Sequence, residues 1–247
     1  MAKNKVICVI PARYASTRLP GKPLAIIGGK PMVEHTYNQV KKATGVFKVI
    51  VATDDEIVKK TIENIGGEAM LTSPEHATGS DRVCEVANCY EDVDIVINVQ
   101  GDEPFIEPEA VEELIKAFED SNVQMATLMT KIKEDEMNLT STVKVITDLK
   151  GDAIYFSRSV IPNQFKKSPI PVYKHLGIYA YKKEFLNVFT NLDKTPLEKT
   201  ESLEQLRALE HGYKIRVLET KTDSIGIDTP EDLKLANEIY KKRLNQS

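Results

Sequence analysis

The sequence has no tryptophan, only three cysteines and no hydrophobic run long enough to cross a membrane. Its lysine-flanked apolar run, residues 6–10, is far too short for a signal peptide or a membrane span. Cys8, Cys84 and Cys89 form no CxxC pair and no Cys/His cluster, so we expect three buried free thiols in a cytoplasmic protein. The net charge of −4 disfavours a nucleic-acid partner and a surface for anionic membranes, and we expect no membrane insertion.

Two common phosphate-binding motifs are also missing. No GxGxxG follows the first predicted strand, which disfavours a dinucleotide-dependent oxidoreductase. No GxxxxGK[ST] occurs either, and Gly28-Gly29-Lys30-Pro31, which matches only the tail of that motif, predicts a turn. A phosphate site in this chain must therefore be built from other residues.

The first half alternates short β-branched runs with amphipathic segments. The continuous apolar runs at 6–10, 49–52 and 95–99 predict strands buried on both faces, as a parallel sheet requires. Two segments between or after them have helical spacing: one contains Val83, Val86, Ala87 and Tyr90, and the other begins at Pro108 and contains Val111, Leu114, Ile115 and Phe118. This alternation predicts an α/β fold with a doubly wound, mostly parallel nucleotide-binding sheet, in a single domain spanning residues 1–247.

The pattern changes after about residue 140. Segments 143–147, 153–157 and 176–181 resemble strands separated by turns rather than by helices, which predicts a smaller β-rich excursion built on the main sheet. A helix around residues 203–210 and a strand at 214–218 follow. A closing helix is expected from about Pro230, with Asp228 or Thr229 as its N-cap.

The loop after the first predicted strand is basic. It carries Arg13, Arg18 and Lys22, together with Ser16 and other small residues, and almost nothing that packs. A nucleoside triphosphate brings about four negative charges, which fixed cations and exposed backbone N–H groups suit. The alternative is a solvated basic loop. Three cations directly after a buried strand favour phosphate binding.

Asp102 directly follows the strand predicted at 95–99, where Gly101 is expected to give the backbone freedom to turn. A carboxylate in this place suits Mg²⁺, which prefers one or two carboxylates plus phosphate oxygens and water. The alternative is that Asp102 caps the helix near Pro108, but Glu107 is better placed for that. Asp228 is a second candidate ligand, although by itself it resembles an ordinary N-cap.

Seven further motifs are spread over essentially the whole chain. They are IPARYASTRLPGKP at 10–23, VATD at 51–54, NVQGDEP at 98–104, YFSR at 155–158, HLGIY at 175–179, LEQLR at 203–207 and GIDTPED at 226–232. The first motif alone is shared loosely with other sugar nucleotidyltransferases, but the combination is far more specific. With these motifs the chain resembles the 3-deoxy-manno-octulosonate cytidylyltransferase (CMP-Kdo synthetase) family.

The resemblance implies that residues 1–130 bind CTP. The segment 76–82 resembles the family's base-contacting stretch, with Ser80 in place of the usual threonine. The implied nucleotide contacts are Arg13, Ser16, Arg18, Lys22, Ser80, Arg82 and Gln100. Without the family resemblance, we would expect Arg82 to be the partner of a nearby carboxylate.

Residues 131–220 are implied to bind the sugar acid and to form much of a homodimer contact, and 221–247 to close the metal site. The implied sugar contacts are Gln100, Arg158, His175, Tyr179, Glu204 and Gln205, with the planar Arg158 fork suited to the sugar carboxylate. Without the family, the histidine would be a structural hydrogen-bonder, the tyrosine strand packing, and Glu204 and Gln205 an exposed helix face.

The implied reaction transfers CMP from CTP to the anomeric hydroxyl of Kdo, which activates Kdo for lipopolysaccharide synthesis. Asp102 and Asp228 would hold one or two Mg²⁺, and Arg13 and Lys22 would complete the catalytic set.

Three alternatives stay open. One is a cytidylyltransferase for 8-amino-Kdo or sialate, or a transferase for another nucleotide. Another is a nucleotide-sugar glycosyltransferase, for which Asp92-Val93-Asp94 is formally a DxD motif, although it precedes a strand instead of ending it. The last is a non-catalytic nucleotide-binding module, which would need no sugar-acid pocket.

Overall fold

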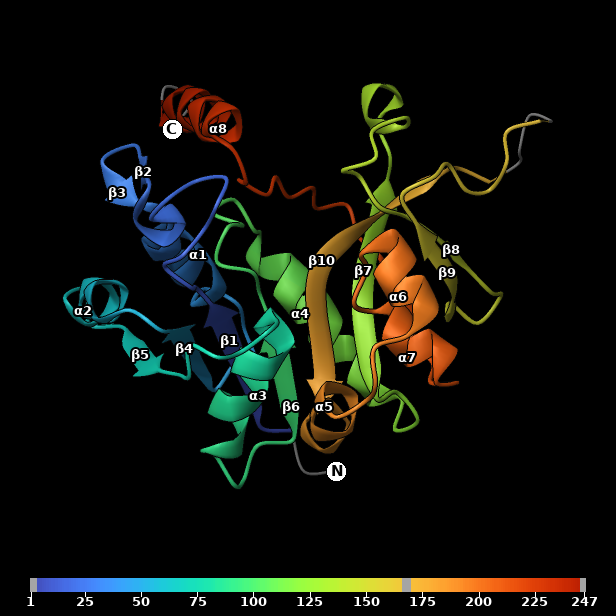
Figure 1. Ribbon diagram of the computed structural model, residues 1–247, viewed down its shortest axis with the longest axis horizontal. Coiled ribbons are helices and arrows are strands. Elements are labelled where there is room, and N and C mark those ends of the chain that lie inside the picture. The colour runs from blue at the N-terminus through green and yellow to red at the C-terminus, as the bar shows by residue number, and fades with distance from the viewer. Residues whose placement is uncertain (1–3, 166–169, 245–247) are drawn as a thin grey trace.

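One mixed β-sheet organises the protein, seen in a computed structural model that describes residues 4–165 and 170–244. The strand order is β11-β7-β10-β6-β1-β4-β5, and β10 alone on this path is antiparallel to its neighbours (Figure 1). The strands are β1 (Val6–Pro11), β4 (Lys48–Thr53), β5 (Glu68–Leu71), β6 (Ile95–Asn98), β7 (Met125–Lys131), β10 (Tyr173–Lys182) and β11 (Arg216–Glu219). The hairpin of β8 (Lys144–Thr147) and β9 (Ala153–Ser157) extends the sheet beside β10.

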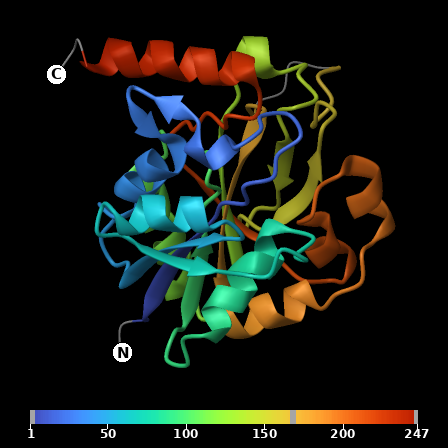
Figure 2. The same cartoon turned by 60° about the vertical axis from the view of Figure 1, so that its left-hand side comes forward.

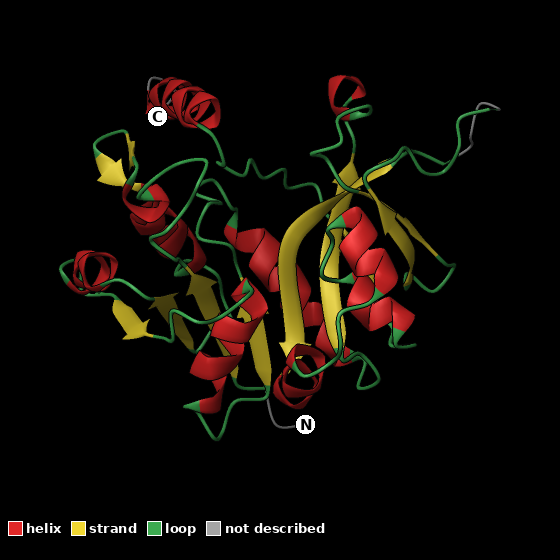
Figure 3. Ribbon diagram, in the orientation of Figure 1, coloured by secondary structure: helices red, strands yellow, loops and turns green. Residues whose placement is uncertain are grey.

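Helices cover both faces of the sheet (Figure 3). One face packs against α1 (Met32–Val40), α2 (Glu56–Glu63) and α4 (Pro108–Lys116). The other packs against α3 (Gly79–Asn88), α5 (Lys183–Thr190) and α7 (Leu206–Glu210), with α6 (Pro196–Glu201) leading into α7. Shorter pieces are the 3-10 helices η1 (Lys22–Leu24), η2 (Ala117–Glu119) and η3 (Glu134–Glu136) and the small hairpin β2 (Ile26–Ile27) and β3 (Lys30–Pro31).

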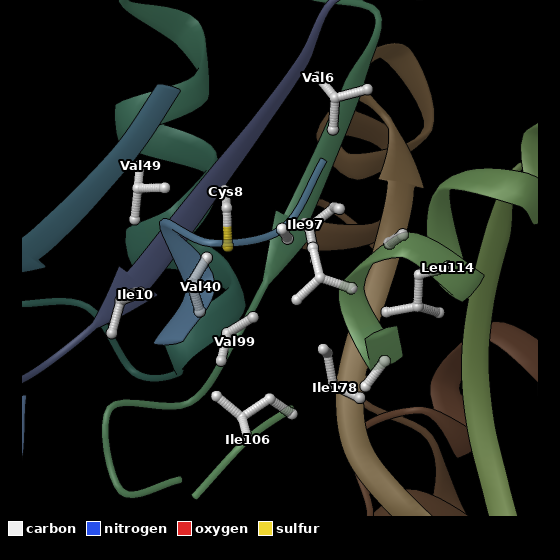
Figure 4. Packing of buried hydrophobic residues seen from close by; sticks show 14 of the residues in the cluster. Val6, Cys8, Ile10, Val40, Val49, Ile97, Val99, Ile106, Leu114 and Ile178 are labelled. Carbon is white, nitrogen blue, oxygen red and sulfur yellow. The ribbon is translucent and has the colours of Figure 1, made fainter. Parts of the chain in front are cut away.

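Strand β1 is continuously apolar because it is buried on both faces. Val6, Cys8 and Ile10 point into the core shared with α1 and α4, where Val40 and Leu114 lie (Figure 4). The intervening residues of β1 point into the core on the opposite face. Because both faces of the strand are buried, every position needs an apolar side chain.

A third, smaller core ties the C-terminus back to the first half. Strand β11 is followed by an extended linker and by α8 (Pro230–Leu244), which crosses above the β2–β3 hairpin (Figure 2). Ile227 and Ala236 pack with Leu19 and Met32. The Asn237 side chain accepts a hydrogen bond from the Gly28 backbone and donates one to the Ile26 carbonyl. Asp228, two residues before this helix, is therefore held close to the first half of the chain.

The predicted architecture is confirmed, including the parallel strands of the first half and the excursion on the main sheet. The turn at Gly28-Gly29 is confirmed as the bend of the β2–β3 hairpin, and both glycines have positive φ. Helix α8 begins at Pro230 as expected. Strands β5 and β7 and helices α1, α2, α5 and α6 were not predicted. The helix predicted through Tyr90 ends at Asn88.

One expectation is wrong, and one that was left open is decided. Cys89 is exposed, whereas Cys8 and Cys84 are buried as predicted. Of the two residues predicted as alternative N-caps of α8, Thr229 is the cap: its hydroxyl accepts from the Asp232 backbone, and the Asp232 carboxylate accepts from the backbones of Asp228 and Thr229. This local exchange leaves the Asp228 carboxylate available for other partners.

Among the helices that the structure describes, none is both long enough and apolar enough to span a membrane.

Candidate active site

A cavity of about 320 Å³ opens where β1 and β6 end. Its walls come from the loop after β1, the turn after β6, the start of α3 and the linker before α8. In open α/β sheets, ligands bind at this carboxyl edge of the strands. The predicted residues that line it are Arg13, Ser16, Arg18, Lys22, Arg82, Gln100, Asp102 and Asp228.

The basic loop is shaped by short local bonds. The Ser16 hydroxyl accepts a hydrogen bond from the Leu19 backbone at 3.3 Å. Gly21 has φ of 65°, a left-handed conformation that glycine adopts without steric cost, and it turns the chain into η1. Lys22 opens η1 and points into the cavity, while Arg13 and Arg18 remain exposed. The loop therefore presents cations instead of the glycine-rich cradle of other phosphate sites.

Asp54 anchors this loop and was not predicted as a site residue. Its carboxylate accepts from the Tyr14 backbone at 3.0 Å and from the buried Arg82 guanidinium at 3.0 Å. Arg82 also donates to the Thr72 hydroxyl. Arg82 was predicted either as a nucleotide contact or as the partner of a nearby carboxylate. It pairs with the Asp54 carboxylate and also lines the cavity, so the two roles are compatible.

Helix α3 points its N-terminus at the cavity. Thr78 caps it with a capping box: the Thr78 hydroxyl accepts from the Asp81 backbone, and the Asp81 carboxylate accepts from the Thr78 backbone. Thr78 and Gly79 line the cavity, so the free N–H groups of the first turn lie close to any bound anion. His76, another lining residue, is held by the Glu85 carboxylate.

Gly101 is required for a reason other than the one expected. A Cβ at this position would lie 3.0 Å from the Pro11 carbonyl oxygen and 3.3 Å from the Ala12 Cβ. The glycine thus lets the turn after β6 approach the end of β1, and its backbone donates to Pro11 at 3.3 Å. This close approach carries Asp102 to the cavity wall.

The two proposed metal ligands converge on one ammonium group. Lys22 Nζ donates to the Asp102 carboxylate and to Asp228 Oδ1, the latter at 2.7 Å. The backbone of Ile227 donates to the Asp102 carbonyl at 3.0 Å, which joins the two segments. Burial alone would lower the pKa of Lys22, but its contacts with Asp102 and Asp228 outweigh this effect and raise it.

This donor set suits a hard cation. Both ligands are carboxylates, and both reach the same point, which the Lys22 nitrogen now takes. Within residues 4–165 and 170–244, no three His, Cys, Asp or Glu side chains converge as a ready-made metal cage. Mg²⁺ commonly binds through one or two carboxylates and completes its shell with phosphate oxygens and water, so the residues present fit it.

Glu103, next to Asp102, was not predicted as a site residue. Burial and the neighbouring Asp102 charge raise its pKa to about 7, against the lowering effect of the hydrogen bond from the Ser224 hydroxyl. The bond ties the turn after β6 to the linker before α8.

His175 and Tyr179 lie together on β10 because of a β-bulge. Four residues of a regular strand span about 13 Å, yet the two rings are 5.3 Å apart between centroids. The pairing with β7 shifts register between Leu176 and Tyr179, which folds the two side chains toward each other. Burial lowers the pKa of His175 to about 3 and raises that of Tyr179 well above its usual value. Both groups are therefore neutral near pH 7.

The tautomer of His175 follows from its partner. The Thr127 hydroxyl donates its hydrogen to a backbone carbonyl, that of Ile178 at 2.8 Å. His175 Nε2, 2.9 Å from the same hydroxyl, must then be the donor. The other ring nitrogen is left as an acceptor, suited to a sugar hydroxyl.

Glu204 and Gln205 are not on an exposed helix face. Gln205 is buried and Glu204 is partly buried, just before α7. The Gln205 Nε2 and Glu204 Oε1 atoms are buried without a hydrogen-bond partner, although an Arg207 nitrogen lies 3.7 Å from the latter. Burial raises the pKa of Glu204 against hydrogen bonds from Thr78 and Ser80. Unpartnered buried polar atoms are costly, and a ligand that pairs with them offsets that cost.

Ser80 faces this second cluster. It is buried, does not line the cavity, and its hydroxyl donates to Glu204 Oε2 at 2.9 Å. The residue that the resemblance assigned to the nucleotide thus links α3 to Glu204, which the resemblance assigned to the sugar acid.

Arg158 is also separate from the cavity. Its guanidinium donates to the carbonyls of Thr140, Glu201 and Ser202, and its backbone donates to the Glu201 carboxylate. Ser202 has φ of 53°, unusual for a residue other than glycine, and it directly precedes the 203–205 turn. In this conformation Arg158 holds the segment that carries Glu204 and Gln205.

Gln100 connects the two clusters. It lines the cavity, and its amide donates to the Asn98 side chain at 2.8 Å. Asn98 on β6 is the register partner of Tyr179 on β10. The Asp92-Val93-Asp94 motif lies at the opposite edge of the sheet, where Lys5 binds both aspartates, so it contributes nothing to this site.

Comparison with known proteins gives consistent matches along the chain. Residues 7–215 match the cytidylyltransferase family. The chain is 50% identical over 242 residues to the 3-deoxy-manno-octulosonate cytidylyltransferase of Geobacter metallireducens, covering 93% of this chain and 95% of that protein. It is 43% identical to the protein of the same name from Myxococcus xanthus, covering 98% and 99% of the two chains.

Solved structures agree. The structure of a CMP:2-keto-3-deoxy-manno-octonic acid synthetase complexed with CTP has a TM-score of 0.93 and 42% identity, covering 97% of this chain and 100% of that one. A 4-diphosphocytidyl-2C-methyl-D-erythritol synthase from Anaerococcus prevotii, at 19% identity and a TM-score of 0.67 over 97% of each chain, shares the fold. The chain therefore belongs to the 3-deoxy-manno-octulosonate cytidylyltransferase family.

Proposed function

We propose that this protein transfers CMP from CTP to the anomeric hydroxyl of Kdo and releases pyrophosphate, which activates Kdo for lipopolysaccharide synthesis. The observation that carries the proposal is the adjacency of two unlike clusters. One is a cavity lined by four cations, Arg13, Arg18, Lys22 and Arg82, and by two carboxylates, and the other is a buried or partly buried group with unpartnered polar atoms. Gln100 lies between them.

In the reaction, the anomeric hydroxyl loses its proton to solvent and its oxygen forms a bond to the α-phosphorus, while the bond from that phosphorus to the leaving pyrophosphate oxygen breaks. Arg13, Arg18 and Lys22 neutralise the triphosphate and the departing pyrophosphate. Arg82, Ser16 and the start of α3 orient the nucleotide. His175, Tyr179, Glu204 and Gln205 bind sugar hydroxyls, and Arg158 serves the sugar carboxylate. Catalysis then consists mainly of positioning and charge stabilisation.

Asp102 and Asp228 would hold Mg²⁺. The ion supplies charge neutralisation at the reacting phosphate. Its binding would require Lys22 to leave the two carboxylates.

We assign residues 1–130 to nucleotide binding, 131–220 to sugar-acid binding and dimerisation, and 221–247 to closing the metal site. A homodimer is supported by apolar side chains exposed on the excursion, including Ile154 on β9 and Phe165, 57% and 90% exposed. A cytoplasmic location is supported by the three free cysteines.

The decisive experiment measures pyrophosphate release from CTP and Mg²⁺ with a panel of 2-keto sugar acids. We expect turnover with Kdo to exceed that with sialate, and parallel assays with 8-amino-Kdo define the amino-sugar alternative. No turnover with any sugar acid would refute the enzyme assignment. Activity with UTP and a neutral sugar phosphate would refute the assignment as a cytidylyltransferase.

A further inference from the structure

The two carboxylates proposed as metal ligands already have a cation between them. Lys22 Nζ contacts both Asp102 and Asp228, and its side chain is 14% exposed. An Arg18 guanidinium nitrogen lies 3.0 Å from the same Asp228 oxygen that binds Lys22. Two negative and two positive charges therefore cancel within this group.

This balance opposes binding of a divalent ion by itself. The ion would have to displace the ammonium from both carboxylates and then lie close to two uncompensated cations. The attraction between charges a few ångströms apart in a partly desolvated site is large enough to change an affinity by an order of magnitude or more.

We propose that Lys22 is an internal counter-ion that reserves the metal site until the nucleotide arrives. The triphosphate brings about four negative charges to the same cavity and offers Lys22 another partner. The ammonium then exchanges the carboxylates for phosphate oxygens, and the carboxylates become free for the metal. This inference rests on the proposed function and adds an order to it: the metal binds with CTP and not before it.

The geometry permits such an exchange. The backbone at Lys22 is fixed by the left-handed turn at Gly21 and by Pro23, which is buried. The ammonium, however, is carried on a flexible four-carbon stem with three donors, and it can change partners without movement of the loop. Arg18 is 65% exposed and binds one carboxylate, so its part in the charge balance is smaller.

The test is a titration with Mn²⁺ in the absence of nucleotide, followed by electron paramagnetic resonance of the free ion. We expect Lys22→Met to bind one Mn²⁺ about tenfold or more tightly than the wild type. Arg18→Met should give a smaller gain, and Lys22→Arg, which keeps the charge, should stay near the wild type. The double variant Lys22→Met/Asp102→Asn should lose the gain.

Lys48→Met is the matched control, because Lys48 also pairs with a carboxylate, Glu68 at 2.9 Å, but at the other edge of the sheet. It should bind Mn²⁺ as the wild type does. Repeating the titration with a non-hydrolysable CTP analogue should tighten Mn²⁺ binding in the wild type much more than in Lys22→Met. Circular dichroism establishes that each variant is folded, and Lys22→Gln replaces Lys22→Met if the latter is not.

Equal nucleotide-free Mn²⁺ affinity in the wild type and in the neutral Lys22 variant would overturn the inference. So would a gain that survives Asp102→Asn, because the ion would then be bound elsewhere. Pyrophosphate release by the wild type is measured separately. If the protein turns over Kdo and CTP but the Lys22 variant binds Mn²⁺ no more tightly than the wild type, only the counter-ion role is refuted. If the variant binds Mn²⁺ more tightly but the wild type shows no turnover, only the proposed function is refuted.

Discussion

The two halves of the site differ in the charge and the hydrogen bonding of their functional groups. On the proposed nucleotide side the functional groups are charged and paired with one another, as with Arg18, Lys22 and the two aspartates, and their exposure ranges from 14% for Lys22 to 65% for Arg18. On the sugar side the groups are neutral or desolvated, and polar atoms of Glu204 and Gln205 lack partners. A highly charged ligand can displace ion pairs, whereas a sugar gains most from donors and acceptors that are already out of water.

Asp102→Asn should have the largest effect, because it removes one of the two carboxylate charges on the proposed nucleotide side. We expect kcat for pyrophosphate release to fall by about a hundredfold or more, because charge stabilisation at the phosphate is lost, with little change in thermal stability. Asp92→Asn is the control, since Asp92 pairs with Lys5 at the opposite edge of the sheet. Near-normal turnover in Asp102→Asn would remove Asp102 as a metal ligand.

Gly101→Ala tests whether packing brings Asp102 to the cavity. The added Cβ would press on Pro11 and Ala12, so we expect a loss of about 1–3 kcal/mol in the free energy of unfolding by urea, together with reduced turnover. Gly177→Ala is the stability control, because a Cβ there meets nothing within 4 Å. Equal stability of the two variants would show that the close approach at Gly101 is not constraining.

Gln205→Met sharpens the contrast, since its two expected effects have opposite signs. Removing a buried unpartnered amide should raise the free energy of unfolding by about 1 kcal/mol. The KM for Kdo should rise about tenfold, while the KM for CTP stays unchanged. A parallel rise in both KM values would mean that Gln205 supports the whole cavity and not the sugar alone.

His175 should give the smallest effect, a pH dependence of stability. Burial holds its pKa at about 3, below the ordinary value of 6.5, so the unfolded chain takes up the proton first. The stability that comes from its neutral form is complete above pH 6.5 and is lost as the pH falls toward 3. Between pH 8 and pH 5.5 we expect the wild type to lose about 1 kcal/mol more than His175→Gln. Identical slopes in urea unfolding would contradict this.

The dimer can be tested apart from the chemistry. Ile154→Glu should shift the mass measured by light scattering from two chains toward one, because Ile154 is 57% exposed on β9 in the excursion. Ile57→Glu is the matched control, since Ile57 is 59% exposed on α2 in the other half. A wild-type protein of single-chain mass would refute the homodimer.

The sequence by itself determined the parallel first half, the basic loop, the carboxylate after β6 and the family. These features depend on local patterns, namely runs buried on two faces, charge within one loop and short motifs. Only the tertiary structure decided that Lys22 joins Asp102 to Asp228, residues 80 and 206 positions away from it. Only the bulge in β10 brought His175 to Tyr179, and only packing made Gln205 a buried residue rather than part of an exposed helix face. Contacts of this kind depend on register and on long-range packing, which no periodicity in the sequence encodes.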